Sequence, residues 1–410
     1  MIGRLPVPLE ESFREVLVSV ARVRHLIGLD DPARLAPKVQ ALTEAYNHPA
    51  LRGVAGVDHL AARLGFWFAR DVPKVAGAVR EAVATGRIAF PEGRALRVLD
   101  LGAGLGASHR GLARALSAHG ATGTLQVLAV DSDAGALQLA ADVAKRRPRE
   151  GDVTIELRTE AIDAAKVSGD KNDRFDVVLL GQVLTELHLG LEPDARVTAH
   201  RELLQSMLAR TTHHGVVVVV EPALRPRARH LMRVRGALIE AGARVFAPCL
   251  HQGRCPLLGR EGDWCHEDLA VDLPKWLVPL AKRAGLRWEG LTFSYLVVGR
   301  DGPTLRERLP IGGPFVERAV TPALQTKGKL EVVLCGDPLK TGVTDDDPLG
   351  PHGTRAGRLD REASEANAAI ASLRRGDVVA LPAPLDEKHR VRSADVVSCI
   401  AGVGDDAQGR

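Results

Sequence analysis

The chain has 410 residues, of which 45% are hydrophobic and 26% charged, with a formal net charge of +4. These values are ordinary for a soluble globular protein of two or three domains, and no apolar run reaches the length of a membrane span. Five cysteines argue against a disulfide framework, and acidic residues interrupt the N-terminal stretch where a secretory signal would be apolar. We therefore expect a cytoplasmic protein, without a membrane partner and monomeric.

Helical spacing of apolar residues marks the N-terminal part of the chain. The pattern is clear in residues 9–27 and continues in further helical segments to about residue 88. We predict an all-helical N-terminal domain over residues 1–88. It contains no motif that points to a chemistry.

Apolar strands alternate with amphipathic helices from residue 89 to about residue 300. Strands are expected within 96–104, 124–133, 153–160, 175–187, 215–222 and 292–300. This alternation predicts an α/β fold with a doubly wound, mostly parallel sheet of the Rossmann-like type. The unbroken run Val216–Val220 is typical of a strand that is buried on both faces.

The C-terminal part, residues 301–410, changes composition. Residues 337–359 are rich in Pro, Gly and Asp and read as a linker or long loop. A helix over 361–376 and short β-like stretches follow. We predict a small C-terminal β-containing module.

A glycine-rich stretch lies between the first expected strand and its helix. Asp100, Gly102, Gly104 and Gly106 fit two templates, the dinucleotide fingerprint and the first motif of class I methyltransferases, and Asp131 suits both. A pyrophosphate would be repelled by Asp100, whereas the ammonium and sulfonium of S-adenosylmethionine would be attracted. The charge favours S-adenosylmethionine, and a nucleotide-dependent oxidoreductase is the less favoured alternative.

The resemblance to class I methyltransferases implies further cofactor contacts. Asp131 would hold the ribose hydroxyls, Glu160 the adenine edge, and Gln182 would lie beside the methionine end. The segment from Gln182 onward lacks the Asn/Asp-Pro-Pro-aromatic motif of amino-methylating enzymes. Glu186 and His188 are candidate bases, but no catalytic residue is assigned.

Three cysteines crowd into residues 246–268. Cys249, Cys255 and Cys265 lie in a loop rich in Gly, Pro and charge, and Cys335 offers a fourth thiolate. Four thiolates can hold zinc or an iron–sulfur cluster, and ligand type alone does not separate the two. His251 and His266 could replace one thiolate, and Cys399 is left over.

A local positive patch precedes the cysteines. Residues 221–260 contain eight arginines against two acids. Five of these arginines are crowded together: Arg225, Arg227, Arg229, Arg233 and Arg235.

The cysteine segment also carries a family resemblance. "APCLHQGRCPL" followed by "DWCH" resembles the methyltransferase-like small-ribosomal-subunit assembly factors of mitochondria and their bacterial relatives. The resemblance covers most of residues 35–340, and Ala223 departs from the Gly that relatives often have. It implies a 4Fe–4S cluster on Cys249, Cys255 and Cys265, with Cys335 as the natural fourth ligand, and contact with ribosomal RNA.

Together these observations predict an S-adenosylmethionine-binding, iron–sulfur-containing, methyltransferase-like factor that acts on the small ribosomal subunit. The alternative is a catalytically active rRNA methyltransferase. The five arginines would contact phosphates, and an aromatic content of only 3% argues against base stacking as the main binding mode.

Overall fold

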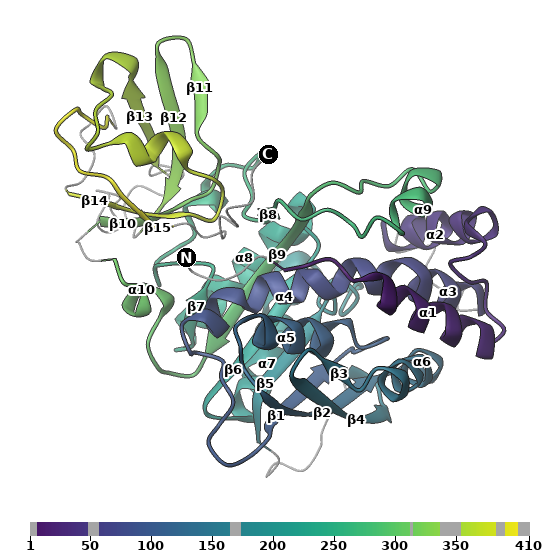
Figure 1. Cartoon of the computed structure of the whole chain (residues 1–410). Helices are drawn as coiled ribbons and strands as arrows, with labels where there is room; N and C mark the ends of the chain where they lie inside the picture. Colours follow the sequence, from purple (N-terminus) through teal and green to yellow (C-terminus); the bar gives the residue numbers. More distant parts are fainter. Residues whose placement is uncertain are drawn as a thin grey trace.

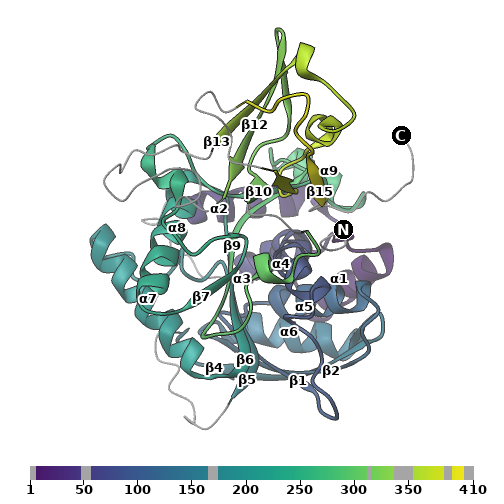
Figure 2. The same cartoon turned by 90° about the vertical axis from the view of Figure 1, so that its left-hand side faces the viewer.

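A nine-stranded mixed sheet forms the centre of the computed structural model (Figures 1 and 2). The structure describes residues 6–47, 57–164, 174–311, 315–336, 354–382 and 390–400. No helix among them is both long and apolar enough to cross a membrane.

The strands of this sheet alternate with helices along the chain. The strands are β1 (Leu96–Leu101), β2 (Gly123–Asp131), β3 (Arg149–Glu150), β4 (Val153–Ala161), β5 (Phe175–Gly181), β6 (Thr211–Glu221), β7 (Arg244–Ala247), β8 (Glu267–Leu269) and β9 (Leu291–Gly299). The helices between them are α5 (Ala107–Ala118), α6 (Ala134–Arg146), α7 (Pro193–Ala209), α8 (Arg225–Glu240), the 3-10 turn η4 (Pro256–Gly259) and α9 (Val278–Arg283).

The strand order confirms the predicted doubly wound sheet. It runs β3-β4-β2-β1-β5-β6-β9-β7, with β8 paired to β9, and the five strands from β4 to β6 are parallel. The order reverses between β1 and β5, which is where doubly wound folds bind their ligands. Strand β9 runs antiparallel between β6 and β7, so the sheet is mixed at this side.

Strand β6 shows why a continuous apolar run suits the middle of this sheet. Val216, Val218 and Val220 pack into the core beneath α5, while Val217 and Val219 pack into the core that α7 and α8 cover. All five are at most 2% exposed. Both faces of the strand therefore lie in apolar surroundings, as the sequence predicted.

The N-terminal region is helical, as predicted. It contains α1 (Glu11–Val23), α2 (Pro32–Asn47), α3 (Val57–Ala62), the π-helical turn η2 (Arg63–Trp67) and α4 (Phe68–Ala84). The first of these helices share a core with α6 and α9, whereas α4 packs on α5 and β9 inside the core of the sheet. The predicted boundary at residue 88 thus follows a helix that belongs to the central unit.

A second, six-stranded antiparallel sheet forms the C-terminal part. After α10 (Leu305–Arg308) its strands are β10 (Phe315–Ala319), β11 (Leu324–Thr326), β12 (Lys329–Cys335), β13 (Thr354–Leu359), β14 (Val378–Leu381) and β15 (Ser398–Ile400). One face encloses a core of its own, and the other packs against the central core. Most of the predicted linker, residues 337–353, lies outside the described residues, and its last part is β13.

The prediction of a helix over residues 361–376 is wrong. The segment forms two short 3-10 turns, η6 (Asp360–Glu362) and η7 (Ala368–Ser372). The buried side chain of Asn367 accepts from the Ser364 N–H at 3.1 Å and donates to the carbonyls of Glu362 and Arg392. Such side-chain bonds replace helical backbone bonds, which is why apolar spacing alone misled the prediction.

A buried ionic network joins the C-terminal sheet to α4. The Arg318 guanidinium on β10 donates two hydrogen bonds to the Glu81 carboxylate, at 2.8 and 3.1 Å, and Tyr295 donates a third. Next to it, Arg80 donates to Glu267 at 2.8 Å. All five side chains are buried, so each charge depends on its partner.

Candidate cofactor cleft and cysteine centre

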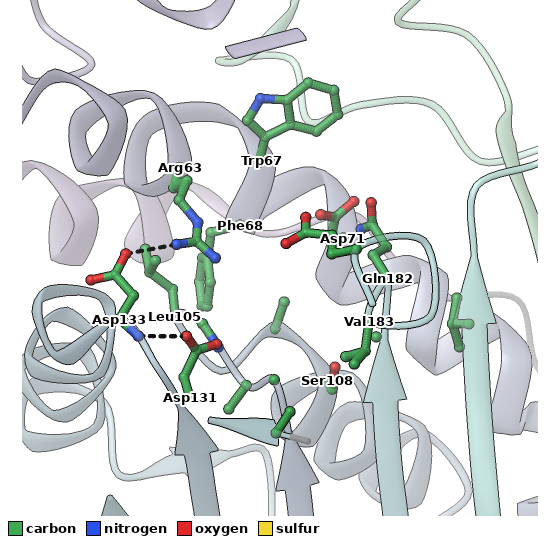
Figure 3. A pocket seen from close by; sticks show the side chains of 18 of the residues that line it. Arg63, Trp67, Phe68, Asp71, Leu105, Ser108, Asp131, Asp133, Gln182 and Val183 are labelled. Atoms are coloured by element: carbon green, nitrogen blue, oxygen red, sulfur yellow. Dashed lines mark hydrogen bonds and ion pairs between the residues drawn. The ribbon is translucent and has the colours of Figure 1, made fainter. Parts of the chain in front are cut away.

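A cleft of about 310 Å³ opens at the carboxyl ends of β1, β2 and β5, at the reversal of strand order (Figure 3). Its size and position are those of a small-molecule site in a doubly wound fold. The glycine turn, the end of β2, the segment after β5 and the η2–α4 region all contribute to its walls.

The glycine turn depends on the absence of side chains. Gly102, Gly104 and Gly106 have φ values of 66°, 53° and 84°, in the left-handed region. A Cβ at position 102 would lie 2.5 Å from Val183, and one at 106 would lie 2.2 Å from the His109 ring. The turn therefore needs glycine for both backbone conformation and space.

Two aspartates follow β2 on one side of the cleft. Asp131 accepts from the N–H groups of Gly104 at 2.7 Å and Asp133 at 2.8 Å. Arg63, from η2, reaches across to the Asp133 carboxylate at 3.0 Å (Figure 3). Burial opposes the charge of Arg63, but Tyr46 and the surrounding carboxylates raise its pKa overall.

The segment after β5 forms the opposite side. Gln182 has φ of +62°, lines the cleft, and donates its N–H to the Val220 carbonyl at 2.7 Å. Glu221, buried at the end of β6, accepts from the Leu184 N–H at 2.9 Å. Burial raises the pKa of Glu221 to about 8, against the effect of that hydrogen bond. Glu221 thus supports the loop from behind the cleft wall.

The roof of the cleft comes from the N-terminal region, to which the sequence assigned no chemistry. Trp67, Phe68, Asp71 and Lys74 line it, and Lys74 Nζ lies 2.7 Å from Asp71 Oδ1. Burial lowers the pKa of Lys74, opposed by Asp71. The helical spacing of these residues is that of any buried helix face, so no local signal in the sequence marked them as cleft residues. Only the packing of α4 against the sheet brings them to the cleft.

Three predicted cofactor residues, Asp100, Gly106 and Glu160, do not line the cleft. Asp100 is fully buried and accepts from His109, with 2.8 Å between Asp100 Oδ2 and His109 Nδ1. Glu160 pairs with Arg158 at 2.6 Å. Asp163, just beyond β4 and three positions after Glu160, lines the cleft. The remaining predicted contacts, Gly102, Gly104, Asp131 and Gln182, do line it.

The two candidate bases separate in the structure. Glu186 lines the cleft, whereas His188 is not among its lining residues. The ring centroid of His188 lies 5.4 Å from that of His200, which in turn contacts His230 at 2.8 Å. Only Glu186 is therefore placed to meet a ligand.

The four cysteines come from both sheets. Cys249 follows β7, Cys255 precedes η4, Cys265 precedes β8, and Cys335 ends β12 of the C-terminal sheet. Burial and then the neighbouring thiols of Cys255, Cys249 and Cys265 raise the pKa of Cys335 well above its ordinary value. The structure thus gathers the four thiols that the sequence singled out.

The four thiols are widely spaced. Among the described residues, no three ligand atoms of these cysteines and neighbouring histidines lie within 4.8 Å of one another. Four thiolates on one tetrahedral zinc ion, each at about 2.3 Å, would be about 3.8 Å apart. Of the two histidines considered as substitutes, His251 contacts a thiol, with Nε2 3.7 Å from Cys335 Sγ.

Two arginines of α8 hold the cysteine loops. Arg235 is fully buried and donates to the carbonyls of His251, at 2.6 Å, and Gly253. Arg229 donates to four carbonyls between Cys255 and Cys265, those of Leu257, Leu258, Arg260 and Asp263. Each guanidinium thus fixes the backbone between two cysteines.

This arrangement corrects the predicted phosphate-binding patch. Arg229 and Arg235 are turned inward because the loop carbonyls need donors, and Arg227 donates to the Tyr46 carbonyl at 2.6 Å. Of the five arginines, only Arg225 and Arg233 are exposed, and Arg233 pairs with Asp194. Local charge density in the sequence did not distinguish structural arginines from surface ones.

A family model described as "Mitochondrial small ribosomal subunit Rsm22" matches residues 67–343, more than half of the chain. No curated protein matches.

Several solved methyltransferase structures are distantly similar. Precorrin-6y C5,15-methyltransferase from Geobacter metallireducens is 14% identical over 53% of this chain and 84% of its own, with a TM-score of 0.29. For ribosomal protein L11 methylase from Lactobacillus delbrueckii subsp. bulgaricus the values are 15%, 52%, 72% and 0.27. For N-methyltransferase NodS from Bradyrhizobium japonicum they are 13%, 56%, 94% and 0.31. TM-scores this low carry no inference about activity.

Proposed function

This chain belongs to the Rsm22 family of the mitochondrial small ribosomal subunit, and on that premise we propose that it is an S-adenosylmethionine-binding, methyltransferase-like factor of the small ribosomal subunit. The observation that carries the cofactor assignment is the acidic cleft at the reversal of strand order. When bound, S-adenosylmethionine supplies an activated methyl group.

The charge of the cleft favours a cationic ligand. Its lining includes the carboxylates Asp71, Asp131, Asp133, Asp163 and Glu186. Two cations, Arg63 and Lys74, oppose them, and each is paired with one of those aspartates. A pyrophosphate would meet an excess of like charge here, whereas a sulfonium would meet opposite charge. The excess of carboxylates therefore gives less support to the oxidoreductase alternative.

The geometry suggests a role for each wall. Asp131, at the end of β2, would accept from the ribose hydroxyls, releasing the Gly104 N–H that it now binds. Asp163 would accept from the adenine edge in place of Glu160. Lys74, already 2.7 Å from Asp71, is the cation available to the methionine carboxylate. Gln182 lies across the cleft from Asp131 (Figure 3).

Calorimetry with S-adenosylmethionine tests this assignment. Asp163→Asn should weaken binding by about tenfold, because one lost charge-assisted hydrogen bond costs about 1.4 kcal/mol or more. Glu160→Gln, three residues away and outside the lining, is the matched control and should leave affinity unchanged. Equal affinities for both variants and the wild type would contradict the assignment, and tight NADH binding would restore the oxidoreductase.

We also propose that Cys249, Cys255, Cys265 and Cys335 hold a 4Fe–4S cluster rather than zinc. The open spacing of the thiols supports a ligand larger than one ion, and four thiolates suit its iron atoms. Iron and acid-labile sulfide in equal amounts, on protein purified without oxygen, would support this. Zinc alone would overturn it.

The ribosomal role is tested separately from chemistry. Exposed arginines remain around the cysteine segment at Arg225, Arg254 and Arg260. Replacing Arg225 and Arg254 with Gln should weaken co-sedimentation with immature small subunits and reduce its salt dependence, because phosphate contacts release counterions.

The same particles, with a labelled methyl donor, decide between the two functions. Transfer that Glu186→Gln abolishes would establish an active rRNA methyltransferase. Binding without transfer leaves an assembly or translation factor that senses its cofactor.

A further inference from the structure

The amino edge of the central sheet, opposite the cofactor cleft, carries a second cluster of ligand-type side chains. His213 and His214 lie near the start of β6, and Asp301 follows the end of β9. One donor atom from each lies within 4.8 Å of the others, and His213 Nδ1 is 3.0 Å from Asp301 Oδ2. We propose that these three residues bind a divalent transition-metal ion of the zinc type.

A bulge in β6 places two consecutive histidines together. Neighbouring residues of a regular strand point to opposite faces of the sheet. Here two steps along β5, from Phe175 to Val177, match five along β6, from Thr211 to Val216. The extra residues bend the strand, and the rings of the two histidines lie 4.6 Å apart.

Two arginines fix the segments that carry the ligands. Arg87 is buried and donates to the carbonyls of His214 at 2.6 Å and Asp301 at 3.1 Å. Arg300 donates to the carbonyls of Thr211 and Thr212, at 3.2 and 3.3 Å. The backbone is therefore held in place before an ion binds, which reduces the ordering cost of binding.

The Asp301 carboxylate is incompletely hydrogen-bonded. Asp301 Oδ1 is buried and has no hydrogen-bond partner among the described residues, although Oδ2 of the same carboxylate contacts His213. Leaving a buried carboxylate oxygen unpaired is costly. A cation bound to Asp301 and the two histidines would offset that cost.

The donor set selects the class of ion. Two imidazole nitrogens and one carboxylate suit zinc, nickel or copper, whereas calcium and magnesium prefer oxygen ligands throughout. Tetrahedral bonds of about 2.0–2.1 Å require donor atoms about 3.4 Å apart, so the present spacing needs only a small closure of two exposed rings. A fourth position would stay open to water.

Zinc titration of the tag-free, chelator-treated full chain tests the site. The wild type should bind one more equivalent of Zn²⁺ than Asp301→Asn, and Zn²⁺ should raise the Tm of the wild type only. His214→Ala should weaken this binding by at least about tenfold. Because each variant retains all the cysteines, zinc held by thiols cancels in the difference.

Two controls keep the result clear. His25→Asn removes an exposed histidine elsewhere and should bind zinc like the wild type; asparagine tolerates the positive φ of this position. Each variant's Tm with zinc is compared with its own zinc-free Tm, so that effects of the substitution on the apo protein cancel. Equal zinc binding by the wild type and Asp301→Asn would overturn the site, whatever the state of the cysteine centre.

Discussion

The cofactor cleft and the cysteine centre are built in opposite ways. The cleft is made largely by short segments at strand ends, and its glycines and Asp131 act where the local sequence places them. The cysteine centre is held from a distance, because Arg229 and Arg235 of α8 bind the carbonyls between the cysteines. The comparison teaches that an arginine-rich helix can serve as the internal scaffold of a cysteine-rich loop.

The largest expected effect concerns Arg235. Arg235→Met should lower the free energy of unfolding by about 4 kcal/mol, since charge-assisted bonds are lost and two buried carbonyls lose their donor. Iron content should fall with it. Arg233→Met, on the same helix but exposed, should cost less than about 1 kcal/mol. Urea unfolding and iron analysis of both variants test this prediction. Similar results for the two variants would contradict the scaffold role of Arg235.

The next effect is a pH dependence of stability that arises from Glu221, which supports the loop behind the cleft wall. The folded pKa of Glu221 is about 8, above the ordinary value of 4.5, so between these values the folded state holds a proton that the unfolded chain has released. The free energy of unfolding should therefore fall as pH rises from about 4.5 to 8, by at most about 1.4 kcal/mol per pH unit.

Glu221→Gln, which cannot ionise, should lack this decline. Chemical unfolding of the wild type and the variant across that pH range measures it. Parallel pH profiles for the two proteins would show that Glu221 is ionised in the fold.

The smallest effect is confined to the cleft. Gly106→Ala should weaken S-adenosylmethionine binding by about tenfold, because the new Cβ meets the His109 ring, which Asp100 holds in place. Gly120→Ala is the matched control: its φ is +76°, but nothing lies within 4 Å of the added Cβ. If both variants bind like the wild type, the turn accommodates the added Cβ and the clash with His109 does not limit binding.

Features that depend on residues close together in the sequence could be predicted, whereas features that depend on the packing of distant segments could not. Strand order, the buried β6 and the glycine turn follow from local patterns, and four of the seven predicted cofactor residues line the cleft. The place of Asp71 and Lys74 in the cleft could not be predicted from local patterns, because it depends on α4 packing over the sheet. The inward arginines were missed for the same reason. The cytoplasmic location and monomeric state stay predictions.

The ionic network around Glu81 has a consequence for any shortened version of the chain. Its strongest partner, Arg318, lies on the first strand of the C-terminal sheet. A truncation before β10 would remove both hydrogen bonds that Arg318 donates to this buried carboxylate, on the helix whose other end roofs the cleft. The C-terminal sheet is therefore a counterion donor to the central unit as well as a module in its own right, and residues 1–310 expressed alone should unfold at a lower urea concentration than the full chain.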